Sequence, residues 1–71
     1  MRPLTEAEAV NLERLMDSCG VERVAQQLAE LCALKANHLE DNWQDRSSAK
    51  VWRRAWAKFE GLAGWLHING I

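Results

Sequence analysis

Apolar residues recur every three or four positions along most of the chain, and this spacing constrains the fold more than any other feature. It produces three runs, and a helix places the apolar residues of each run on one side. The first run holds Leu12, Leu15, Met16 and Cys19, the second Val21, Val24, Ala25, Leu28, Leu31, Cys32 and Leu39, and the third Trp52, Ala55, Trp56, Phe59, Ala63 and Leu66. The pattern predicts an all-α fold.

Local signals mark where each helix begins and ends. Thr5 and Glu8 have the spacing of a capping box, in which each side chain hydrogen-bonds the backbone N–H of the other residue. Gly20 suits the left-handed conformation in which many helices end. Asp45 follows a polar stretch and can cap a third helix by accepting from the N–H of Ser47 or Ser48. Three separate helices are therefore expected.

We expect these helices near residues 5–19, 21–41 and 46–66 of a single domain, residues 1–71. Only one residue separates the first two, so they are predicted to pack as an antiparallel hairpin. The third helix is predicted to cross that hairpin, giving a small three-helix domain. A chain of this length forms only a marginal core by itself, which favours burial against a partner or a second copy.

Charge is unevenly divided along the chain. Residues 1–45 carry nine acidic and four basic side chains, a net charge of −5, whereas residues 46–71 carry one acidic and five basic side chains, a net charge of +4. The simpler interpretation is that acidic helices pack beside a basic helix within one molecule. The alternative is a basic face offered to an acidic partner, nucleic acid included.

The third helix combines tryptophans with cations on different faces. Trp52, Trp56 and Phe59 share one helical face and are interpreted as core or as the seam of a homodimer. The predicted basic face consists of Arg46, Lys50, Arg53, Arg54 and Lys58. Proteins that bind single-stranded nucleic acid stack bases on aromatic rings that lie among cations. The rings and cations of this helix are on different faces, so this mode of binding is not favoured.

Four other residues are predicted to bind a protein partner, because helical packing does not explain them. They are His38, Trp43, Gln44 and Trp65. Tryptophan is enriched among the residues that dominate binding energy at interfaces, and both Trp43 and Trp65 lie off the apolar face.

Lys35, His38, Asp41 and Asp45 surround the break between the second and third helices. A lysine beside a carboxylate and a histidine could form an acid–base site. The favoured interpretation is a structural lock, in which Lys35 reaches Asp45 or the carbonyl groups that end the second helix while its aliphatic stem covers apolar surface. A metal site is not expected, because Cys32 and His38 do not share a helical face. No cofactor or catalytic residue is predicted.

The cysteines and the N-terminus bear on the compartment. Cys19 and Cys32 fall in apolar stripes, so both are predicted to be small core residues in a reducing compartment. No apolar segment typical of a signal peptide is found near Met1, and no apolar run is long enough to cross a bilayer. The protein is expected to be soluble and cytoplasmic.

The stretch K-A-x-H-L-x-x-N-W-Q-D, from Lys35 to Asp45, resembles a group of short, uncharacterised helical proteins of bacteria and their phages. The matching residues are Lys35, Ala36, His38, Asn42, Trp43, Gln44 and Asp45, followed by Ala49, Lys50 and Trp52. The resemblance covers about half of the chain and implies a helical fold but no activity. It also implies that this polar surface is one unit.

These observations favour a non-catalytic protein–protein interaction module that forms a homodimer, with a phage-type accessory or inhibitor protein as one concrete version. The alternative is a nucleic-acid-binding regulator that uses the basic face of the third helix. The stretch VAQQLAEL within residues 21–43 resembles the first helix of a helix-turn-helix. That resemblance fails at Ala29, where a turn glycine is expected. An enzyme is not expected.

Overall fold

Three α-helices make up the fold in a computed structural model that describes residues 1–70. They are α1 (Glu6–Cys19), α2 (Val21–Trp43) and α3 (Arg46–Asn69), and no strand lies among the described residues. The all-α prediction is confirmed. Both long helices extend past their predicted ends near residues 41 and 66.

The capping box predicted at the start of α1 is present. The Glu8 N–H donates to the Thr5 hydroxyl at 3.2 Å, and the Thr5 N–H donates to Glu8 Oε1 at 2.9 Å. Arg2 adds an interaction that the sequence did not reveal, donating from Nη2 to Glu8 Oε2 at 2.8 Å. The Arg2 guanidinium and the Thr5 N–H together lower the pKa of Glu8 to about 2. The capping box and the Arg2–Glu8 interaction thus stabilise the first turn of α1.

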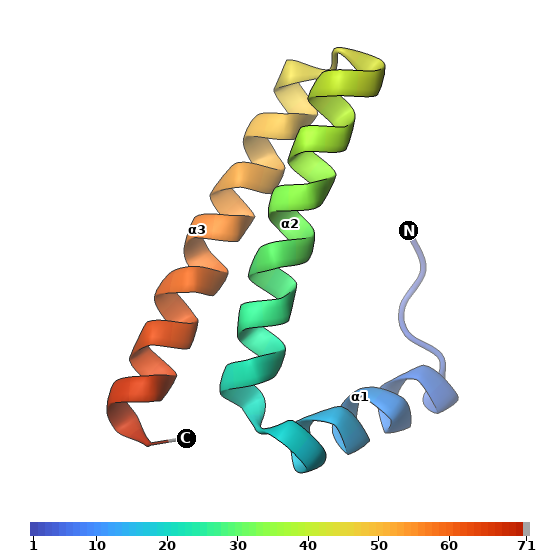
Figure 1. Ribbon diagram of the computed structural model, residues 1–71. Coiled ribbons are helices and arrows are strands. Elements are labelled where there is room, and N and C mark those ends of the chain that lie inside the picture. Colours follow the sequence, from blue (N-terminus) through green and yellow to red (C-terminus); the bar gives the residue numbers. More distant parts are fainter. Residues whose placement is uncertain (71) are drawn as a thin grey trace.

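The helical hairpin is formed by α2 and α3, which run antiparallel side by side (Figure 1). The predicted hairpin of the first two helices is wrong. Within residues 1–70, α1 contacts α2 but not α3, and it turns away from the hairpin at the start of α2. The reason lies at Gly20, whose φ is 85° and ψ is 156°. This extended conformation directs α2 away from α1, whereas a hairpin of the two helices would need a compact turn.

A turn of two residues joins the long helices. Gln44 adopts the left-handed conformation, with φ 51° and ψ 31°, and ends α2. Asp45 then caps α3, because its Oδ1 accepts from the Ser48 N–H at 3.0 Å. This hydrogen bond lowers the pKa of the Asp45 carboxyl group, and the Ser48 side chain lowers it by a smaller amount. The polar break therefore reverses the chain within a very short distance.

Small side chains form the buried seam between α2 and α3. The buried residues are Ala25, Ala29, Cys32 and Ala36 on α2 and Ala49, Ala63 and Leu66 on α3. The intervals on α2 are four, three and four residues, a spacing typical of paired helices. The buried side of α2 therefore differs in part from the predicted apolar stripe. Leu28 and Leu31 lie outside the seam and are exposed, while Ala29 and Ala36 occupy it.

The molecule is a single layer of helices. Its shortest dimension is 14 Å, little more than the ~10–12 Å diameter of one helix with its side chains. Its radius of gyration is 13.9 Å, whereas a compact chain of this length has about 11 Å. No residue of α1 is buried. Soluble domains ordinarily enclose a core between two layers, and this chain supplies only one.

Candidate functional site

At the closed end of the hairpin, near the turn, His38, Asn42 and Trp43 form a hydrogen-bonded group. The Trp43 Nε1–H donates to His38 Nε2 at 3.4 Å, and the side-chain amide of Asn42 lies 2.9 Å from His38 Nδ1. Both neighbours present an N–H donor, and a neutral imidazole accepts a hydrogen bond at only one ring nitrogen, so His38 can accept from Trp43 or from Asn42 but not from both at once. The imidazole ring lies between these two side chains.

Trp43 remains 70% exposed despite this hydrogen bond, and Gln44 beside it is also exposed. Three of the four predicted partner-binding residues thus meet at one end of the molecule. Trp65 does not join them. It is 55% exposed near the far end of α3, about five turns along the helix from the start at Arg46. The predicted set divides into two separate places.

The predicted lock between Lys35 and Asp45 is not formed. Neither a hydrogen bond nor an ion pair joins them within residues 1–70, and Lys35 is exposed. Asp45 uses its carboxylate to cap α3 instead. The charged link between the long helices at this end is a different pair, Arg53 Nη2 to Glu40 Oε2 at 2.5 Å.

The aromatic residues of α3 differ in their environment. Trp52 and Phe59 are half-buried, on the same side as the buried Ala49 and Ala63. Trp56 is more exposed, and its Nε1–H donates to Glu60 Oε1 at 2.9 Å. The seam to which Trp52 and Phe59 contribute lies within one molecule.

The five cations of the predicted basic face do not act as one surface. Arg53 is half-buried and paired with Glu40, and Arg46 lies with Glu40 and Asp41 around a small polar hollow. The other three, Lys50, Arg54 and Lys58, are exposed and form no ion pair with the residues that the structure describes. These three lie four residues apart and form an exposed positive strip along α3; Arg46 likewise forms no ion pair within residues 1–70 but lies apart from the strip, at the start of the helix.

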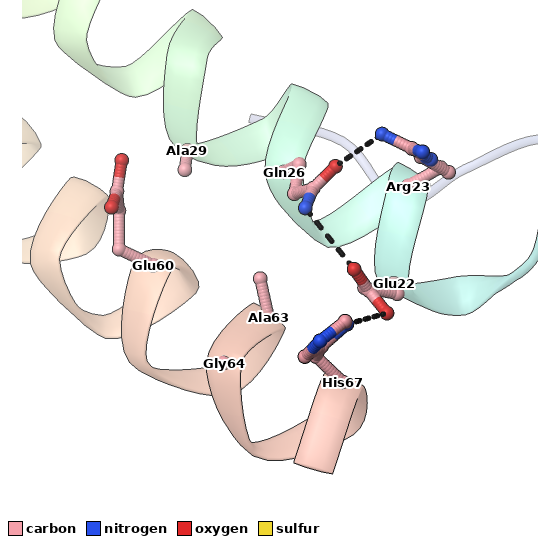
Figure 2. Close-up of a pocket in the computed structure, with 8 residues that line it drawn as sticks. All are labelled: Glu22, Arg23, Gln26, Ala29, Glu60, Ala63, Gly64 and His67. Carbon is pink, nitrogen blue, oxygen red and sulfur yellow. Dashed lines mark hydrogen bonds and ion pairs between the residues drawn. The ribbon is translucent and has the colours of Figure 1, made fainter. Parts of the chain in front are cut away.

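A polar hollow of about 590 Å³ lies at the open end of the hairpin, between the first turns of α2 and the last turns of α3 (Figure 2). Its lining residues are Glu22, Arg23, Gln26, Ala29, Glu60, Ala63, Gly64 and His67. His67 Nδ1 lies 3.3 Å from Glu22 Oε1, Gln26 Nε2 donates to Glu22 Oε2 at 3.2 Å, and Arg23 donates to Gln26 at 3.2 Å. The contact of His67 with Glu22 joins the two helices, whereas the other two lie within α2.

His67 and Glu22 could in principle exchange a proton, but the hollow offers little else for chemistry. No serine, threonine or cysteine lines it, and the His67 side chain is 77% exposed to water. An activated nucleophile needs a base within hydrogen-bond distance. The third helix was predicted to end near residue 66, before His67, but α3 continues to Asn69. The position of His67 in α3, facing Glu22, indicates that the pair fastens the open end of the hairpin.

An apolar groove of about 560 Å³ opens in the angle between α1 and α2, and sequence reasoning missed it. We call it the elbow groove. Its apolar lining consists of Leu12, Leu15 and Cys19 of α1 and Val24, Leu28 and Leu31 of α2, and its polar lining of Arg23, Gln26, Gln27 and Glu30. The signal was present in the sequence, because the leucines of both stripes lie at helical spacing. They were assigned to a core that the two helices do not form.

Cys19 was also expected in a core and is exposed in this groove, whereas Cys32 is buried in the seam. Cys19 Sγ donates to the Leu15 carbonyl oxygen at 3.0 Å. Within residues 1–70, no three histidine, cysteine or acidic side chains lie close enough together to ligate a metal. None of the described helices combines the length and the apolar character needed to cross a bilayer.

Comparison with protein-family models, with curated proteins and with solved structures found no match to this chain.

Proposed function

We propose that the protein is a non-catalytic helical interaction module that associates with a second copy of itself. The observation that supports the proposal is the unpaired apolar stripe of α1. Leu12, Leu15 and Met16 lie on one side of that helix, yet none of its residues is buried. An amphipathic helix gains most of its stability in a protein by packing its apolar side, so α1 needs a surface that residues 1–70 do not provide.

The exposed area of the molecule supports the same proposal. The described chain exposes 5854 Å², whereas a compact monomer of this size exposes about 4,500 Å². A stable interface between two proteins buries about 800 Å² on each partner. The excess is larger than this requirement. A dimer could therefore bury the excess surface, and the second copy would act as the second layer of helices.

Self-association is tested by sedimentation velocity and thermal unfolding of the wild-type protein over a hundredfold range of concentration. We expect a dimer at tens of micromolar, which corresponds to ordinary dimer affinities. The unfolding midpoint should rise with concentration, because a partner that binds only the folded chain stabilises it by mass action. A monomer throughout, with a constant midpoint, would contradict the proposal.

A nucleic-acid-binding regulator is the second candidate, supported by the unpaired cations Lys50, Arg54 and Lys58 on the outer side of α3. Phosphate contacts by three cations predict affinity that falls steeply with salt. Titrating duplex DNA and single-stranded RNA at about 50 and 200 mM salt should then show a roughly twentyfold to fiftyfold loss of affinity. Absence of binding at the lower salt concentration would exclude this candidate.

A further inference from the structure

We propose that the second copy binds in the elbow groove, so that α1 and α2 of each molecule cover the same helices of the other around a twofold axis near Gln27. This inference rests on the proposed self-association and goes further by naming the surface and its register. Symmetric dimers commonly pair one surface with itself, which requires that the surface be complementary to its own rotated copy. The elbow groove meets this requirement in its apolar and in its charged residues.

The apolar residues of α2 satisfy the symmetry first. Val24, Leu28 and Leu31 lie along one side of the helix and line the groove, with exposed fractions of 38% for Leu28 and 46% for Leu31. In an antiparallel pair with the axis near Gln27, Val24 of one copy lies opposite Leu31 of the other. Leu28 lies next to the axis and contacts its own counterpart. The apolar residues thus meet apolar residues along the whole row.

The positions of the charged residues in the groove are compatible with the same twofold axis. Arg23 and Glu30 line the groove seven residues apart, which is two turns of helix, so they lie on nearly the same side of α2 about 10 Å apart. Neither forms an ion pair within residues 1–70; Arg23 makes only its 3.2 Å hydrogen bond to Gln26. The rotation that places Val24 opposite Leu31 also brings Arg23 of each copy near Glu30 of the other. Two equivalent ion pairs would flank the apolar row.

The outer side of α3 is a poorer surface for a second copy. Its exposed Leu62 and Trp65 lie beside Lys58 and Arg54 along that helix. A twofold axis through this region would bring cations of one copy against the same cations of the other, which opposes association. The elbow groove carries both signs of charge in a self-complementary order. This difference favours the groove.

The position of the interface is tested by two matched substitutions. Leu28→Glu places a charge at the proposed axis and is expected to weaken the dimer by more than a hundredfold. Leu62→Glu makes the same change on α3, where the leucine has a similar exposed fraction of 43%, and should leave the dimer intact. Circular dichroism confirms that both variants stay helical. Loss of the dimer in Leu62→Glu with its retention in Leu28→Glu would overturn the inference.

The register is tested by reversing charges. Arg23→Glu and Glu30→Arg should each weaken the dimer about tenfold at low salt, since each reverses two ion pairs to like charges. The double variant Arg23→Glu/Glu30→Arg should recover wild-type affinity. An equimolar mixture of the two single variants should also recover it as a heterodimer, because every contact between the copies is then attractive. Lys50→Glu, an equal change of charge outside the groove, is the control and should have no effect.

The outcomes separate this inference from the proposed function. A wild-type dimer whose affinity is not restored by the double variant or by the mixture contradicts the register while leaving self-association in place. A wild-type monomer contradicts both. Restoration in the mixture supports the inference most directly, because a change within a single chain cannot produce it.

Discussion

Replacing Ala36 with leucine is expected to lower the free energy of unfolding by about 2 kcal/mol, the usual cost of forcing extra methylene groups into a filled site. Ala36 is only 1% exposed and lies in the small-residue seam, opposite a helix on which Ala49 is fully buried. A larger side chain there must push α2 and α3 apart. A chain of 71 residues has a total stability of about 4–10 kcal/mol, so the loss is a large fraction of it.

Urea unfolding at one fixed protein concentration measures this effect, with Ala57→Leu as the control. Ala57 lies in α3 and is exposed, so the same substitution there should change stability by less than about 0.5 kcal/mol. Equal stability of the two variants would mean that the seam has room for a larger residue. The close approach of the two helices would then not depend on alanine.

Gly20→Ala is expected to cost about 1–3 kcal/mol, entirely through backbone strain. At φ 85° and ψ 156°, Gly20 occupies a region that residues with a Cβ rarely adopt. A Cβ added at this position meets no atom within 4 Å, so crowding makes no contribution. Because Gly20 also sets the direction of α1, the variant should weaken self-association together with stability.

Gly64→Ala is the matched control, and its effect should have the opposite sign. Gly64 lies inside α3, and an added Cβ there also meets nothing within 4 Å. Alanine in the interior of a helix is more stable than glycine by roughly 0.5–1 kcal/mol. Thermal unfolding of the two variants compares them directly. Destabilisation by Gly64→Ala, or no change in Gly20→Ala, would contradict the conformational argument.

The helix boundaries could be predicted because their signals are local. The Thr5–Glu8 capping box, the Gly20 terminus and the Asp45 cap each depend on residues no more than three or four positions apart. Such contacts are encoded in a short window of sequence. The pairing of helices is not encoded in this way. A single connecting residue suggested a hairpin of α1 and α2, but the backbone conformation at Gly20 directs α1 elsewhere.

The seam on α2 was predicted only in part, for a related reason: Ala25 and Cys32 of the predicted stripe are buried in it, but its leucines are not. Leucine has the larger transfer free energy, so Leu28 and Leu31 were placed inside ahead of Ala29 and Ala36. Two long helices joined by a turn of two residues instead pack closely through small side chains, which leaves the leucines at the edge. The recurrence of small residues on α2 at intervals of four, three and four, three alanines and Cys32, was the available signal.

The sequence places His38, Trp43 and Gln44 together because they are neighbours at the end of one helix, and a hydrogen bond joins His38 and Trp43 there. That these residues bind a partner stays a prediction. Trp65 could not be placed relative to them without the length of α3. The elbow groove depends on the angle between two helices, a quantity that no local pattern carries. Its charged residues form no ion pair within residues 1–70, so the sequence of one molecule indicates no partner for them.

The attachment of α1 through a single glycine also bears on how the protein folds. Contacts between α2 and α3 begin at a turn of two residues and can extend outward along the seam as far as Glu22 and His67. Such nearby contacts close with little loss of chain entropy and favour rapid formation. Since α1 contributes nothing buried, its order is separable from that of the hairpin. In an isolated monomer the backbone amides of α1 should therefore exchange with solvent long before those of α2, and dimerisation should bring the two rates together.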